Sequence, residues 1–113
     1  YNNNIIKIKF YGNFPFTIPS VLYNNHKYHN MLIFRNEYYR NYLSRLDINC
    51  LCCISIICSN NWCPTKKIQD ILDEVINNYK LVMKMFYCYY IEKICLQNNI
   101  YCLELQNLII SYI

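Results

Sequence analysis

Two prolines in the segment Phe14–Pro19 (FPFTIP) restrict what the beginning of this 113-residue chain can form. Proline has no backbone N–H and a fixed φ, so it disrupts a helix interior and removes hydrogen bonds from a central strand. We therefore predict an extended turn packed by its aromatic rings, which argues against an all-helical interaction protein. The flanking segments favour strands: Ile5–Phe10 alternates apolar and polar residues from Ile6 onward, and Ser20–Tyr23 resumes as a short strand.

The middle of the chain combines one ambiguous segment with one apolar run. Met31–Asp47 mixes charged and aromatic residues and is either a surface helix or a long ordered loop. Ile48–Cys58 is almost continuously apolar and predicts a strand covered on at least one face. Ser59–Asn61 follows as a turn signal.

A helix is expected to follow the motif Trp62-x-Pro64, with Thr65 as its cap and Lys66 as its first residue. Its apolar residues keep helical spacing at Ile68, Ile71, Leu72, Val75 and Ile76. The helix either runs to about Ile94 or breaks near Asn77-Asn78. Beyond a turn at Asn98-Asn99, Ile100–Ile113 predicts a final apolar helix.

Charge and hydropathy exclude some classes of protein. The net charge is +4, but the basic residues are scattered among carboxylates, so no nucleic-acid partner is predicted. The longest apolar-looking run, Leu81–Leu96, holds three charged residues and predicts no membrane span. The eight cysteines could form the disulfide framework of a secreted domain. Because no secretory signal is evident, reduced thiols and a cytoplasmic or nuclear location are the favoured interpretation.

Two blocks of sequence, taken together, have a recognisable order. The turn Phe14–Pro19 leads without a gap into Ser20–Tyr23, and Tyr28-His29 follows. Cys53–Ile57 then precedes Trp62-x-Pro64 and the helix that follows it. This order resembles the ubiquitin-conjugating enzyme family over about two thirds of the chain, from Ile5 to Ile76.

The resemblance implies an α+β fold of the ubiquitin-conjugating (UBC-like) type. An antiparallel β-meander would pack against a central helix, with an additional C-terminal helix. Residues 1–113 would form a single core domain that lacks the family's N-terminal helix and first strands.

The resemblance also implies a reaction and its partners. Cys53 would be the catalytic nucleophile that carries ubiquitin or a ubiquitin-like protein as a thioester and passes it to a lysine or a ligase. Asn30 would be the catalytic amide that stabilises the oxyanion. Phe16 and Pro64 would bind the ubiquitin ligase, and an activating enzyme would load Cys53. Trp62 is expected to be a packing anchor, and His29 to be structural.

Other interpretations remain open. His29 is followed by Asn30 and Met31, so the proline of the family's His-Pro-Asn motif is missing, and about a dozen extra residues precede Cys53. These departures favour a non-catalytic variant that acts as a ubiquitin-binding or scaffold subunit. Retention of Cys53 opposes this alternative. Taken without the resemblance, Cys53 could be a small buried apolar residue.

A metal site is a weaker interpretation of the cysteines. Cys50-x-x-Cys53 could bind zinc with further ligands drawn from Cys58, Cys63, His26 or His29. A single Cys-x-x-Cys without a second matching pair is a weak signal, so no metal is predicted. Gly12 is the sole glycine, which excludes a glycine-rich phosphate loop, and no cofactor is expected.

Overall fold

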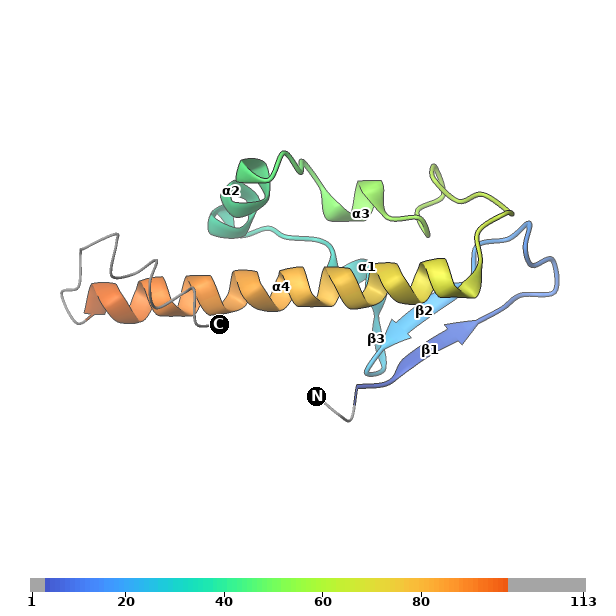
Figure 1. Cartoon of the computed structure of the whole chain (residues 1–113), viewed down its shortest axis with the longest axis horizontal. Helices are drawn as coiled ribbons and strands as arrows, with labels where there is room; N and C mark the ends of the chain where they lie inside the picture. Colours follow the sequence, from blue (N-terminus) through green and yellow to red (C-terminus); the bar gives the residue numbers. More distant parts are fainter. Residues whose placement is uncertain (1–3, 98–113) are drawn as a thin grey trace. The chain divides into compact units, whose positions relative to one another are not determined.

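The computed structural model describes residues 4–97, which form an α+β arrangement as the sequence predicts (Figure 1). The elements in chain order are β1 (Ile6–Lys9), β2 (Ser20–Tyr23), β3 (His26–Lys27), α1 (Tyr28–Met31), α2 (Glu37–Arg45), α3 (Leu51–Ile54) and α4 (Ile68–Gln97). The turn at Asn98-Asn99 and the helix expected over Ile100–Ile113 lie outside the described residues. The chain divides into two compact units, Tyr1–Asn78 and Tyr79–Ile113, and the packing discussed below is that of the first unit.

The three strands form an antiparallel sheet in the order β1-β2-β3, and the strands predicted over Ile5–Phe10 and Ser20–Tyr23 are confirmed. Ile6 pairs with Tyr23, and Ile8 with Val21. Because alternate side chains of a strand point to opposite faces, these four residues share one face. Val21 and Tyr23 are buried there, whereas Lys7 and Lys9 are exposed.

A two-residue turn joins β2 to β3. Asn24 and Asn25 both have positive φ, at 49° and 67°, and the flanking residues Tyr23 and His26 pair with each other. These are the features of a type I′ turn, whose twist matches that of the strands and in which asparagine is favoured. The Asn24 side chain also accepts a hydrogen bond from the backbone N–H of Ile5 at 2.8 Å.

The segment Phe14–Pro19 is a turn packed by aromatic rings, which confirms the prediction. The backbone N–H of Phe14 donates to the carbonyl of Tyr11 at 2.8 Å, and that of Phe16 donates to Asn13 at 2.7 Å. The rings of Phe10 and Phe14 meet edge to face, with their centroids 4.6 Å apart. The Phe14–Pro15 peptide bond is cis.

α2 resolves the ambiguity of the segment 31–47 in favour of a helix with defined ends. The Asn36 side chain accepts a hydrogen bond from the N–H of Tyr38 at 2.7 Å and caps the helix. At the other end the N–H of Ile48 donates to the carbonyl of Leu43, and that of Asp47 to Ser44. This is a Schellman motif, with Asp47 at a φ of 59° in the position usually taken by glycine.

The strand predicted over Ile48–Cys58 is wrong. Four of its residues form α3, with Leu51 buried, and the chain then continues through turns. In a strand, the backbone N–H of Ile56 would bond to a neighbouring strand. Here it donates instead to the Glu74 carboxylate at 2.7 Å. The turn predicted at Ser59–Asn61 is confirmed.

α4 begins at Ile68, two residues later than predicted, and Thr65 does not cap it. The Asp70 carboxylate instead accepts a hydrogen bond from the Lys67 N–H at 2.8 Å, which is one half of a capping box. Ile71 and Val75 are fully buried along the predicted apolar stripe. The helix continues unbroken through Asn77-Asn78 to Gln97.

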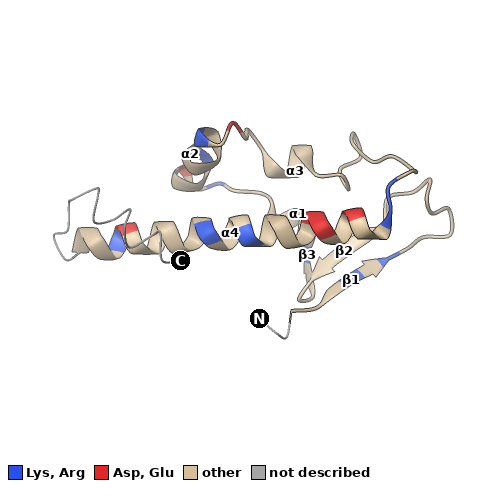
Figure 2. Ribbon diagram, viewed as in Figure 1, with Lys and Arg blue, Asp and Glu red and all other residues tan. Residues whose placement is uncertain are grey.

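Figure 2 shows where the charged residues of the described part lie. Acidic residues lie in the first turns of α4, where they complement the helix dipole. The lysines and arginines are distributed over several elements. Within residues 4–97, no helix combines the length and apolarity needed to cross a bilayer.

Candidate active site

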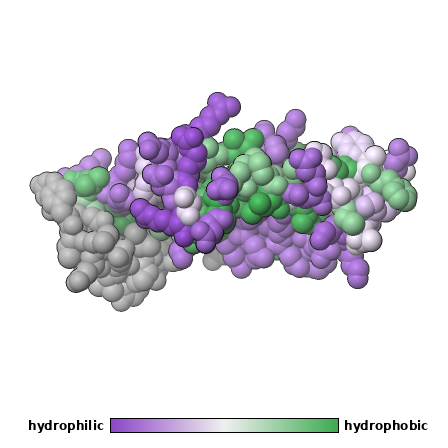
Figure 3. Space-filling model, turned by 90° about the horizontal axis from the view of Figure 1, so that it is seen from above, coloured by the Kyte–Doolittle hydropathy of each residue, from purple (hydrophilic) through white to green (hydrophobic). Residues whose placement is uncertain are grey.

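Cys53 lies at the surface in α3. Its backbone carbonyl accepts a hydrogen bond of 2.6 Å from the side-chain amide of Asn61, and the same amide donates to the Ser55 carbonyl at 3.0 Å. Asn61 thus ties the turn after α3 to the end of that helix. The next residue, Ile54, is 60% exposed, and Figure 3 shows hydrophobic surface over α3 on the face seen from above. The predicted nucleophile is therefore accessible and has apolar surroundings.

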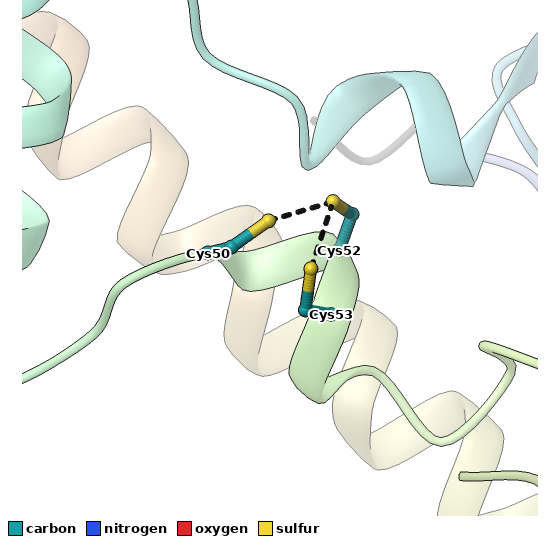
Figure 4. Close-up of side chains that lie close together, drawn as sticks. All are labelled: Cys50, Cys52 and Cys53. Atoms are coloured by element: carbon teal, nitrogen blue, oxygen red, sulfur yellow. Dashed lines mark hydrogen bonds between the residues drawn. The ribbon is translucent and has the colours of Figure 1, made fainter. Parts of the chain in front are cut away.

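Three thiols meet around this position (Figure 4). The Cys52 sulfur lies between the other two, 2.8 Å from that of Cys50 and 3.9 Å from that of Cys53. Cys50 is the residue that precedes α3, with an extended backbone. The side chain of a residue at that position turns back toward the second and third residues of the helix, which here are Cys52 and Cys53.

The three thiols shift one another's pKa. Hydrogen bonds from Cys52 and Cys53 lower the pKa of Cys50. Hydrogen bonding to Cys50 raises the pKa of Cys52 to about 12 and also raises that of Cys53. Such a group loses its protons in steps that belong to the cluster as a whole. Because its pKa is raised, Cys53 is less readily ionised than an isolated cysteine.

Asn30, the predicted oxyanion donor, lies in α1 with an exposed side chain. No hydrogen bond within residues 4–97 joins it to Cys53, so its catalytic role stays a prediction. The amide that does contact Cys53 belongs to Asn61, which the sequence marked only as part of a turn. His29, next to Asn30, is also exposed.

The two sequence blocks that carry the family resemblance meet at Trp62. Its indole N–H donates to the Pro15 carbonyl at 2.8 Å, and its ring lies 6.3 Å from that of Phe14. This contact agrees with the expected role of Trp62 as a packing anchor. Phe16 is 79% exposed and Pro64 is exposed, so the two predicted ligase-binding residues lie on loops that this hydrogen bond joins.

Comparison with family models, curated proteins and solved structures gives no match.

Glu74 organises the inner side of the candidate site. One carboxylate oxygen accepts hydrogen bonds from the Tyr28 hydroxyl at 2.9 Å and the Ser55 hydroxyl at 2.8 Å, and the other accepts the Ile56 N–H. The Asn78 amide donates to the Tyr28 hydroxyl at 2.6 Å. This network holds the segment after α3 against α4.

Glu74 is not among the site residues predicted from the sequence, although the sequence holds one signal for it. It lies three residues after Ile71 and next to Val75, and both of these residues are fully buried. An acidic residue at that spacing shares the buried side of the helix. Such a carboxylate needs hydrogen-bond donors from elsewhere in the fold.

We expect Cys63 and Cys53 to differ in reactivity although both are exposed. The Thr65 hydroxyl, 3.1 Å from the Cys63 sulfur, lowers the pKa of Cys63, whereas the pKa of Cys53 is raised. Because the thiolate is the reactive form, iodoacetamide should label Cys63 faster than Cys53 at pH 7, by several-fold. Peptide mapping by mass spectrometry after timed labelling measures both rates.

The matched control is Thr65→Val, which removes the hydroxyl and should slow the labelling of Cys63 without affecting Cys53. Equal rates at the two cysteines in the unmodified sequence would contradict the expectation.

Proposed function

We propose that this chain is an acyl carrier of the ubiquitin-conjugating type, with a UBC-like fold and Cys53 as the thioester-forming residue. The hydrogen bond from Trp62 to Pro15 is the observation that carries the proposal. It joins Trp62 to a residue 47 positions earlier and so brings together two blocks that resemble the family only as a pair. The exposed thiol of Cys53 is the second support.

In the proposed reaction, the Cys53 sulfur attacks the carbonyl carbon of the thioester that links a modifier protein to its activating enzyme. A new sulfur–carbon bond forms, the activating enzyme's thiolate leaves, and the two thioesters are of similar energy. A lysine amine or a ligase cysteine then takes the acyl group. The proton of the Cys53 thiol goes to the departing thiolate, so the exchange balances without a further group.

The surface of the first unit supports a protein as the partner. Ile54 is exposed beside Cys53, and Phe16 and Pro64 are exposed on the two joined loops. A partner protein that covered these residues would remove their apolar surface from water, which favours binding. The partners we propose are ubiquitin or a ubiquitin-like protein, an activating enzyme and a ligase, in the cytoplasm or nucleus.

A non-catalytic member of the same class is the second candidate. Two observations favour it: Asn30 makes no hydrogen bond to Cys53 within the described residues, and the pKa of Cys53 is raised rather than lowered. Such a protein would bind a modifier protein without forming a thioester.

Incubation with an activating enzyme, ATP and ubiquitin, followed by a non-reducing gel, separates the two candidates. We expect an adduct that a thiol reductant removes. In Cys53→Ser the adduct should persist as a reductant-stable oxyester, and in the matched control Cys63→Ser it should remain reductant-sensitive. If no adduct forms with ubiquitin or its relatives while the protein still binds one of them, the non-catalytic function is the correct one.

A further inference from the structure

The sulfur atoms of Cys50, Cys52 and Cys53 form a convergent group that the proposed acyl transfer does not require. All three lie within 4.8 Å of one another, and Figure 4 shows them gathered at one side of α3. Thioester formation needs one accessible thiol, so the acyl carrier function leaves two of the three unexplained. Among the described residues, this group includes neither Cys58, Cys63 nor a histidine.

The separations suit three ligands around one small ion. Metal–sulfur bonds of about 2.3 Å in a trigonal plane place the sulfur atoms about 4 Å apart. The distance from Cys52 to Cys53 is 3.9 Å, which already fits. The distance from Cys50 to Cys52 is 2.8 Å, and a rotation of the Cys50 side chain, which is not enclosed in the core, would widen it.

The chemistry of the three groups favours a soft cation. Thiols are weak hydrogen-bond donors, so the contacts among the three sulfur atoms hold them together only weakly. A cation among them would bind the deprotonated sulfur atoms, and their protons would be released as it binds. Thiolate ligands select Cu(I), zinc or iron–sulfur clusters over harder ions.

The number of ligands distinguishes among these ions. Structural zinc is almost always bound by four protein ligands, and cysteine-bound iron–sulfur clusters use four thiolates. Three sulfur atoms are a complete trigonal set for Cu(I). We propose that Cys50, Cys52 and Cys53 form a three-thiolate binding site for Cu(I). Binding releases up to three protons to solvent, forms three copper–sulfur bonds and transfers no electron.

This site has a consequence for the acyl carrier, although it does not depend on that function. Cys53 cannot hold copper and an acyl group with the same sulfur, so Cu(I) would prevent thioester formation. The sequence predicted no metal, because Cys50-x-x-Cys53 has no second matching pair. The structure adds Cys52 to this pair, which a strand would have pointed away from Cys53.

The test is a competition titration of the reduced, full-length protein with Cu(I) and bathocuproine disulfonate under anaerobic conditions. We expect one equivalent of tightly bound Cu(I), and at least tenfold weaker binding in Cys52→Ser. The matched control Cys63→Ser, which removes an exposed thiol outside the group, should bind as the unmodified protein does. Equal Cu(I) affinities of Cys52→Ser and Cys63→Ser would overturn the proposed site.

X-ray absorption of the unmodified protein gives a readout that needs no variant. Three sulfur neighbours at about 2.3 Å from copper are the expected result. Two sulfur neighbours, or stoichiometric binding of Zn(II) with no uptake of Cu(I), would overturn the assignment. Neither measurement uses ubiquitin, so failure of the metal site and failure of the acyl carrier can be told apart.

Discussion

Replacing Glu74 by glutamine is expected to lower the free energy of unfolding by about 2–4 kcal/mol, since hydrogen bonds to a charged group are the stronger ones and unpaired buried groups are costly. The carboxylate accepts three hydrogen bonds, from Tyr28, Ser55 and Ile56. A glutamine side chain keeps one acceptor oxygen, but its NH2 group would face hydroxyl or N–H groups that are themselves donors. Urea unfolding followed by the fluorescence of Trp62, the sole tryptophan, measures the change.

Asp73→Asn is the matched control for this substitution. Asp73 is the preceding residue, and its exposed carboxylate accepts one hydrogen bond, from Gln69 at 2.7 Å. Its replacement should change the free energy of unfolding by less than about 0.5 kcal/mol. Similar losses in the two variants would mean that Glu74 does not hold the segment after α3.

Replacing Tyr28 by alanine is expected to lower the free energy of unfolding by about 3–5 kcal/mol, the usual cost of removing a buried aromatic ring. Tyr28 is fully buried. Burial also raises the pKa of its hydroxyl, so at neutral pH the group stays protonated and donates to Glu74. The same urea titration measures the loss.

Tyr28→Phe separates the ring from the hydroxyl and should cost about 1–2 kcal/mol, because Glu74 loses a donor and Asn78 an acceptor. Combined with Glu74→Gln, it should show a non-additive loss, since the two residues share a hydrogen bond. Tyr11→Ala, at a half-exposed tyrosine of the same unit, serves as the control. It should change the free energy of unfolding by less than about 0.5 kcal/mol. If Tyr28→Ala lowered the free energy of unfolding as little as Tyr11→Ala, the burial of Tyr28 in the core would be contradicted.

Much of the first unit could be predicted because it follows from local rules. Alternation located β1 and β2, and the prolines located the turn over Phe14–Pro19. The apolar stripe located α4, although its start depends on the Asp70 cap rather than on Thr65. These features depend on residues within a few positions of one another.

The segment around α3 could not be predicted in the same way. The apolar residues of Ile48–Cys58 suit a strand as well as a short helix, and the deciding partner, Glu74, lies 18 residues beyond Ile56. The candidate site could be predicted only in part for the same reason, because its contacts also depend on residues that are distant in the sequence. The sequence predicted Cys53 as a site residue, and the structure places it at the surface. The hydrogen bond from Asn61 to Cys53 and the closeness of Cys52 could not be predicted, because both depend on the turns around α3.

The type I′ turn at Asn24-Asn25 has a consequence for protein engineering. Because both residues have positive φ, glycine should replace either without strain, whereas a β-branched residue should not. A single residue inserted there would shift the pairing of β2 with β3 by one position, and such a slip moves every side chain of a strand to the opposite face. Any graft of this hairpin onto another scaffold should therefore keep the two-residue loop intact.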